Sequence, residues 1–236
     1  MMFGIPRIAA ALVALTIAIP TAPADARVSR SAPPSAAPGD SVAAAAASLA
    51  EAAAAAGLRN EVLDLALRAH ARATALGRTT SSILTVIDYS LPSRERRFWV
   101  LDVVEGTVLE RELVAHGNRT GGDIATAFSN RPGSNQSSLG TFVTGATYRG
   151  KHGRSLRLHG LDAGLNDRAL DRAIVVHGAA YVNEGIVGQL GRLGRSQGCP
   201  ALSESAAQRI IDLIRDGTVI FSYHPSADFE TLLAAS

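Results

Sequence analysis

A histidine and a cysteine, each beside glycine, are the residues of this sequence best suited to chemistry. His177 ends the apolar run Ala173–Gly178 (AIVVHG), and Cys199 lies in the glycine-rich segment Gly191–Ala201 (GRLGRSQGCPA). The first segment predicts a buried strand and the second a loop, because glycine and proline interrupt regular structure. A neighbouring imidazole can take the proton of a thiol and stabilise the thiolate. The pair therefore indicates a nucleophile, Cys199, with His177 as its base.

The residues on either side of the thiol favour this interpretation. Gly198 frees the backbone just before Cys199, and Pro200 biases Cys199 itself towards extended geometry. Attack on a carbonyl creates an oxyanion, and the backbone N–H groups of Gly198 and Cys199 are candidates to stabilise it. The structural alternatives are an inert buried thiol and a histidine that only ends a strand.

The N-terminus predicts export. Residues 1–26 contain the apolar stretch Ile8–Ile19 and end in Ala24-Asp25-Ala26, the pattern of a signal peptide with its cleavage site. We expect a protein of the periplasm or cell-wall space, without stable membrane insertion after cleavage; a retained anchor is the alternative. The sequence has one cysteine, so it forms no internal disulfide.

Composition says little about the partner. The net charge is +2, and the basic residues are scattered without the aromatic interleaving of single-strand binding proteins. We therefore expect no nucleic-acid partner.

Three further zones follow the presumed signal peptide. Residues 27–41, rich in Pro, Ser and Ala, predict a disordered tether. Residues 42–77 predict two helices broken at Gly57, a helical segment that either supports the main domain or binds a partner. Residues 78–236 form the main domain.

The main domain is predicted to be mainly β with a few helices. Strand-like segments, rich in β-branched and aromatic residues, are Ile83–Tyr89, Arg97–Val104, Val108–His116, Gly140–Tyr148, Ala173–His177 and Val219–Tyr223. One helix is expected after the N-cap Ser203, with an apolar stripe of isoleucines, Arg215 in its last turn and Gly217 at C′.

The segments IVVHG and GRLGRSQGC together resemble the L,D-transpeptidase (YkuD-like) catalytic domain family. Its signature is a His-Gly followed about twenty residues later by Ser-x-Gly-Cys. Three other segments look like a divergent branch of that family: Asn130–Phe142, Tyr148–Leu158 and Leu165–Asp167. Two departures are Gln197, where a histidine is common, and Pro200-Ala201, which replace a hydrophobic residue followed by Arg or Asn.

The resemblance implies a small β-sandwich or barrel with the cysteine and histidine at one open edge. It implies that Cys199 attacks a peptidoglycan stem peptide after its third residue, releases D-Ala and passes the acyl group to an amine. The backbone carbonyl of Gly178 would be the third member of the catalytic triad. No metal or organic cofactor is implied.

Further residues are candidates for substrate contact. Arg195, Ser196 and Gln197 lie just before the cysteine, and Tyr148 and Tyr181 are expected near the cleft. A metal site formed by Cys199 with His116, His152 and His159 is a weaker alternative, since zinc ligands usually come in tighter pairs.

Two other functions stay open. An L,D-carboxypeptidase would use the same residues and let water resolve the thioester, and a non-catalytic module would only bind the cell wall. The sequence does not determine the acceptor, the third stem residue or the oligomeric state.

Overall fold

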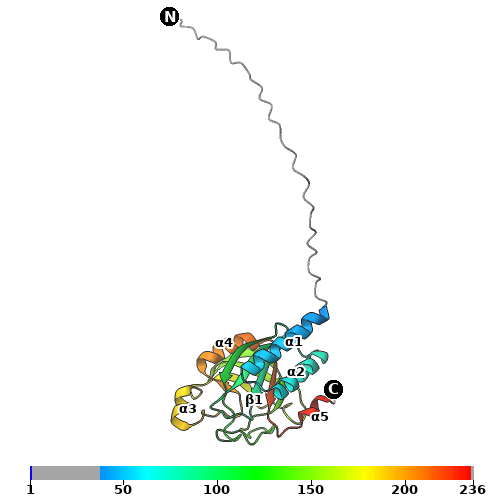
Figure 1. Cartoon of the computed structure of the whole chain (residues 1–236). Helices are drawn as coiled ribbons and strands as arrows, with labels where there is room; N and C mark the ends of the chain where they lie inside the picture. Colours follow the sequence, from blue (N-terminus) through cyan, green and yellow to red (C-terminus); the bar gives the residue numbers. More distant parts are fainter. Residues whose placement is uncertain (2–37, 235–236) are drawn as a thin grey trace. The chain divides into compact units, whose positions relative to one another are not determined.

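The computed structural model describes Met1 and residues 38–234, which form five helices and one sheet of eight strands (Figure 1). The expected signal peptide after Met1, and the expected tether up to residue 37, lie outside the described residues. The helices are α1 (Pro38–Ala55), α2 (Asn60–Ala75), α3 (Glu184–Leu190), α4 (Glu204–Ile214) and α5 (Phe229–Ala234). The strands are β1 (Ile83–Asp88), β2 (Arg96–Asp102), β3 (Thr107–Leu113), β4 (Gly140–Gly150), β5 (Gly153–Gly160), β6 (Val175–Gly178), β7 (Ala201–Leu202) and β8 (Val219–Tyr223). The prediction of a mainly β domain is confirmed.

The sheet curls until its two ends nearly meet. Its strand order is β3-β2-β1-β8-β4-β5-β6-β7, and most neighbours are antiparallel. Beyond the end of β3, Ala115 forms an antiparallel bridge with Ala201 of β7, and Gly117 pairs with Ser196. These two bridges join the outermost strands along a seam.

Helix α4 lies with one face against the sheet and the opposite face exposed to solvent. It packs against β1, β5, β6 and β7, strands from distant parts of the strand order. Its buried Ile210, Ile211 and Ile214 form the predicted apolar stripe, and full burial of such a side chain contributes about 1.5–3 kcal/mol. Helix α4 therefore holds together strands that are far apart in the strand order.

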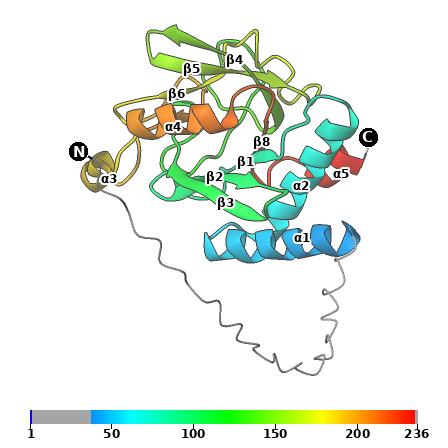
Figure 2. The same cartoon turned by 90° about the horizontal axis from the view of Figure 1, so that it is seen from above.

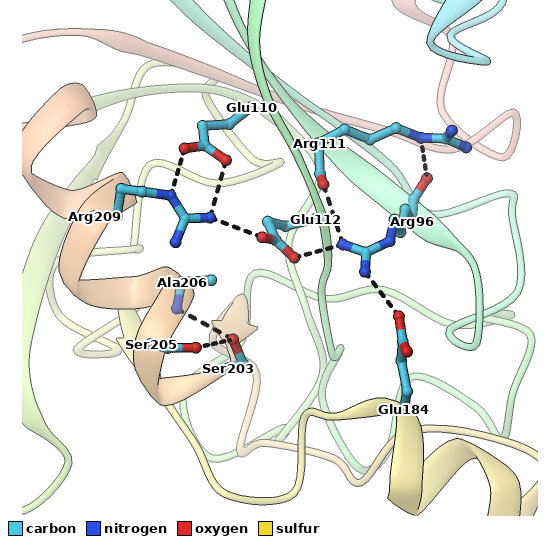
Figure 3. Close-up of polar contacts among 9 residues, drawn as sticks. All are labelled: Arg96, Glu110, Arg111, Glu112, Glu184, Ser203, Ser205, Ala206 and Arg209. Atoms are coloured by element: carbon cyan, nitrogen blue, oxygen red, sulfur yellow. Dashed lines mark hydrogen bonds and ion pairs between the residues drawn. The ribbon is translucent and has the colours of Figure 1, made fainter.

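The two ends of α4 differ in how well the sequence predicted them. Ser203 is the N-cap, and its hydroxyl accepts from Ala206 N. The helix ends one residue earlier than predicted. Arg215 is the C-cap rather than part of the last turn, and Asp216 at C′ has the left-handed φ of 65° that was expected at Gly217. On its outer side, Arg209 binds Glu110 and Glu112 of β3 (Figure 3).

The helical segment before the sheet is part of the same packed core. Gly57, with a φ of 76°, separates α1 from α2 as predicted. Helix α1 begins at Pro38, within the range expected for the tether. Helix α2 packs on β1 and β8, and α1 on β3 (Figure 2). Trp99 Nε1 donates to Ala56 O at 2.9 Å, so the turn between the helices is bonded to β2.

Several strand ends differ from the prediction for local reasons. Strand β6 begins at Val175 rather than Ala173, because Ala173 has a left-handed φ of 51°. Strand β3 ends at Leu113, although the chain runs on to the seam. Strand β5 was not predicted, because arginines and a histidine fill its exposed positions. It pairs with β4 through a two-residue turn, Lys151-His152.

None of the helices in the described part of the chain is both long and apolar enough to span a bilayer.

Candidate active site

The loop before β7, residues 191–200, holds the single cysteine and is fastened to the seam of the sheet. Ser196 N donates to His116 O at 2.9 Å, and Asn118 N donates to Ser196 O at 2.8 Å. Ala115 N donates to Ala201 O at 2.8 Å just beyond the cysteine. The loop is thus held on both sides of Cys199 by backbone hydrogen bonds, which do not depend on side-chain identity.

Inside the loop, one serine hydroxyl sets the turn that presents Cys199. Gly198 N donates to Ser196 Oγ at 3.0 Å, and the same hydroxyl donates to Cys199 O at 2.6 Å. Gly198 has a φ of 120°, and a Cβ there would lie 2.8 Å from Gln136 O, so only glycine fits. Gly198 N–H is therefore engaged within the turn, unlike the free donor expected from the sequence. Ser196 is buried and bonded to its own loop rather than free for substrate.

The sulfur of Cys199 lies against the start of β6. In the parallel register of β6 and β7, His177 faces Ala201, so two residues earlier Cys199 falls beside Val175. Val175 N–H points at Sγ from 3.5 Å, and Sγ lies 3.7 Å from Ala173 O. The left-handed turn at Ala173 directs this carbonyl towards the thiol, a strained conformation of the kind that often occurs at functional sites.

His177 is held by one hydrogen bond and one stacking contact. Its Nδ1 lies 2.9 Å from Gly178 O. Because a carbonyl only accepts, Nδ1 carries the proton and Nε2 keeps its lone pair. The imidazole of His152, in the β4–β5 turn, stacks on the His177 ring with centroids 4.5 Å apart and an interplanar angle of 28°.

Burial acts on both groups in the direction that keeps them neutral. It raises the pKa of the Cys199 thiol, an effect that the Val175 N–H and the charges of Arg172 and Lys151 partly oppose. It lowers the pKa of His177, partly opposed by the bond to Gly178 O. Since desolvation disfavours each charged form, burial favours a protonated thiol and a neutral imidazole.

A cavity of about 720 Å³ opens over the cysteine and the histidine. It is lined by Cys199 and His177 and by all five residues expected to contact substrate: Tyr148, Tyr181, Arg195, Ser196 and Gln197. Gly178 lies in an adjoining cavity of about 480 Å³, beyond the β4–β5 turn. The structure thus brings together residues from β4, β6 and two loops.

Other residues of the cavity were not singled out for this site. Lys151 and His152 belong to the segment Tyr148–Leu158, already noted from its likeness to a family pattern. Nothing in the sequence indicated that Arg172 belongs to the site, because the turns before β6 look like ordinary surface sequence. Ser137 lies beneath the loop, accepting from Gly117 N and donating to Gly198 O at 3.2 Å.

The alternative metal site does not assemble. His116 is buried and does not line the cavity. Its Nδ1 accepts a hydrogen bond from Arg97, and its Nε2 donates one to Gly122 O. His152 stacks on His177. In the described part of the chain, no three His, Cys, Asp or Glu side chains are grouped as metal ligands would be.

Comparison with known proteins gives a family match. A family model described as the L,D-transpeptidase catalytic domain matches residues 54–223, which include α2, the whole sheet and both candidate catalytic residues. Comparison with curated proteins finds no match.

Solved structures of low sequence identity were also found. An L,D-transpeptidase from Mycobacterium smegmatis is 19% identical, with a TM-score of 0.38, and the alignment covers 61% of this chain and 59% of that one. One from Xylanimonas cellulosilytica is 18% identical, with a TM-score of 0.35, and the alignment covers 65% and 68%. The chain thus spans less than two thirds of the length of the M. smegmatis structure.

Proposed function

The chain belongs to the L,D-transpeptidase catalytic domain family, and from this membership we propose that it is a cysteine-dependent peptidoglycan L,D-transpeptidase. The observation that supports the proposal most is the shared cavity of Cys199 and His177, with His177 Nδ1 bonded to Gly178 O. This bond orients the ring and leaves Nε2 free to accept a proton. The proposed site of action is the periplasm or cell-wall space, in keeping with the signal peptide expected at residues 1–26.

In the first proposed half-reaction, the donor stem loses its terminal residue. Cys199 Sγ attacks the carbonyl carbon between the third stem residue and D-Ala while His177 Nε2 takes the thiol proton. The C–N bond then breaks, and His177 returns the proton to the leaving amine. The stem peptide remains attached to Cys199 as a thioester.

The second half-reaction reverses these roles. An acceptor amine attacks the thioester, His177 takes a proton from it, and the sulfur leaves as a thiolate that regains that proton. The products are a new amide and the resting enzyme. The overall exchange is one amide for another, so it needs no oxidant or external energy source.

The oxyanion of both steps needs donors that are not already engaged. Gly198 N–H is bonded to Ser196 Oγ, whereas no described residue accepts from Cys199 N–H. We therefore assign the first oxyanion donor to Cys199 N–H; Gly198 N–H can take part only by releasing Ser196. Each such donor typically contributes about 10²–10³-fold in rate.

The neutral resting pair suggests when the thiolate forms. Because burial raises the pKa of Cys199 and lowers that of His177, proton transfer accompanies attack rather than preceding it. His177 then acts as a general base.

The decisive experiment incubates the purified protein with disaccharide-tetrapeptide and follows the products by mass spectrometry. Release of D-Ala with formation of a 3-3 cross-linked dimer is expected, with Cys199→Ala as the inactive control. Tripeptide without dimer would instead identify an L,D-carboxypeptidase. No Cys199-dependent product would contradict the proposal and favour a module that only binds the wall.

Acylation of the thiol gives a second test. We expect a carbapenem to add to Cys199, with the intact mass rising by that of the drug. An unchanged mass after long incubation, in a protein shown to be folded, would argue against a nucleophilic Cys199.

A further inference from the structure

Arg172, at the end of the turns before β6, spans the gap between two loops of the cavity. One of its terminal nitrogens donates to Ser129 O and Ser138 Oγ. The other donates to Ser134 Oγ at 3.2 Å and to Gln136 O at 2.6 Å. All four acceptors belong to residues 129–138, the loop that packs against the cysteine loop.

The same guanidinium reaches the nucleophile loop itself. A Cβ added to Gly198 would lie 3.4 Å from Arg172 Nη2 and 2.8 Å from Gln136 O, to which Nη2 donates. Ser137 joins the same contact by donating to Gly198 O. Arg172 thus lies directly beside the peptide that precedes Cys199.

The charge of Arg172 has no carboxylate partner. Its acceptors are carbonyl and hydroxyl oxygens, and no Asp or Glu of the described chain forms an ion pair with it. No Asp or Glu lines the cavity either. Arg172 is partly buried, and burial lowers its pKa, opposed by the neighbouring Cys199. A desolvated, unpaired cation is costly, which suggests that the charge has a use here.

We propose that Arg172 is a positioning residue that holds the cysteine loop against residues 129–138 and supplies the positive charge that stabilises the Cys199 thiolate. The proposal rests on Cys199 being the nucleophile of the proposed function. It assigns the thiolate a cation other than His177, which burial keeps neutral at rest. In this arrangement the charge is fixed before substrate arrives, because four hydrogen bonds hold the guanidinium in place.

Other groups around the thiol also bear on its titration. They are Lys151 and His152 from the β4–β5 turn, His177 from β6, Tyr181 and Arg195 from the flanking loops, and Tyr89 beneath the cysteine loop. Among them Lys151 is an exposed side chain at a turn tip. Arg172 differs because hydrogen bonds fix its guanidinium in place. We therefore expect its removal to change the titration of Cys199 more than the removal of any other of these groups.

The test measures the rate of iodoacetamide alkylation against pH, with no substrate present. Because the sequence has one cysteine, the labelling reports Cys199 alone. The midpoint of this pH–rate curve reports the charge around the thiol. The plateau rate at high pH reports the accessibility of the thiol to iodoacetamide. We expect Arg172→Gln to raise the midpoint by about one pH unit, which is about tenfold slower labelling at pH 7.

Two variants separate charge from structure. Arg172→Lys keeps the charge and should leave the midpoint near that of the wild type, even if the plateau changes. Arg168→Gln, the matched control, removes an exposed arginine from the same turns and should leave both unchanged. The proposal would be overturned if the midpoint of Arg172→Gln equalled that of the wild type. It would also be overturned if Arg172→Lys shifted the midpoint as much as Arg172→Gln does.

A further pair keeps the test valid if Arg172→Gln does not fold. Ser134→Asp places a carboxylate on the Arg172 nitrogen that now binds the serine hydroxyl, and Ser134→Asn is its neutral control. We expect only Ser134→Asp to raise the midpoint, because it neutralises Arg172 in place; equal midpoints would count against the proposal. These measurements need no turnover, so a failed transpeptidase assay would leave their outcome intact.

Discussion

Arginines on the outer edge of the sheet bind carboxylates, whereas arginines near the cysteine bind neutral oxygen or nitrogen acceptors. On the edge, Arg209 of α4 binds Glu110 and Glu112 of β3, and Arg96 binds Glu112 and Glu184 (Figure 3). In the cavity, Arg172 meets only carbonyl and hydroxyl oxygens. The edge neutralises its charges within the fold, whereas the cavity keeps a positive charge available.

A second arginine near the seam follows the pattern of the cavity. Arg97 is fully buried, donates to Val114 O, Leu91 O and His116 Nδ1, and lies over the ring of Tyr89. Burial lowers its pKa to about 10. His116 in turn holds Ser196 N through its backbone carbonyl. The comparison teaches that ion pairs fasten the outside of this fold, while unpaired cations bound to neutral acceptors lie beneath and beside the cysteine loop.

The sharpest test of this contrast removes the nucleophile from one region and a charge from the other. We expect Cys199→Ala to lower turnover of disaccharide-tetrapeptide by about 10³-fold or more, and Arg209→Gln to leave it within about twofold. The measurement is the initial rate of D-Ala release. Comparable losses in the two variants would mean that the edge network is as important for catalysis as the cavity.

A buried ion pair offers a case between the two extremes. Arg72 of α2 binds Asp162, which is fully buried and also accepts from Thr141 N. Removing one partner of such a pair typically costs about 3–5 kcal/mol, so Asp162→Ala should lower the free energy of unfolding in urea by that amount. The control is Asp212→Ala: Asp212 pairs with Arg154, but its own side chain is 60% exposed. Its loss should cost much less, because solvent screens exposed ion pairs; equal costs in the two variants would show that burial does not matter.

Acid should lower the free energy of unfolding through the buried His116 rather than through the surface ion pairs of Arg209 and Arg96. Burial and the nearby Arg97 lower the pKa of His116 to about 4, from an ordinary value near 6.5. As the pH falls through 6.5 the unfolded chain takes up a proton that the folded chain refuses. Stability is therefore lost between pH 6.5 and about 4, by about 3 kcal/mol.

Urea unfolding at pH 7 and pH 4.5 measures this loss. Glutamine can accept from Arg97 and donate to Gly122 O but does not titrate, so His116→Gln should show a much smaller loss. Burial also lowers the pKa of His177 and His224, so part of the loss should remain. An undiminished loss in His116→Gln would place the acid sensitivity elsewhere.

The smallest effect is expected at the edge itself. Arg209 is about half exposed, and exposed pairs contribute about 0.2–1 kcal/mol, so Arg209→Gln should lower unfolding stability by no more than about 1 kcal/mol. Salt at 1 M should reduce the difference from the wild type, because it screens exposed charges. A loss well above this range, unaffected by salt, would contradict the assignment of the network to the surface.

The sequence predicted those parts of the fold whose local pattern agrees with their burial. Strand β8 (Val219–Tyr223) matches its predicted bounds, and its five residues are all buried. Strand β5 has Arg154, Arg157 and His159 among its residues and forms because β4 folds back onto it. Strand β7 is two residues long, and the register with β6 creates it rather than its own composition. Such elements depend on partners that one segment does not reveal.

The site was predictable where chemistry and backbone coincide in one segment. His177-Gly178 and the cysteine loop could be recognised because each contains its reactive group and its glycine together. Arg172 could not be recognised, since its partners Ser129, Ser134, Gln136 and Ser138 are 34 to 43 positions earlier. The bond from Gly198 N to Ser196 Oγ was also missed, because glycine flexibility alone does not say where an N–H points.

The bridges that join β3 and β7 give the cysteine loop a mechanical constraint. Ala115, Gly117, Ser196 and Ala201 close the seam, so the loop cannot swing away without reopening the sheet. Local opening there should approach the cost of global unfolding, and the amide protons of Ala115 and Ser196 should exchange with solvent about as slowly as those of the core. The β4–β5 turn has no such closure, so adjustment to substrates of different shape falls to that side of the cavity.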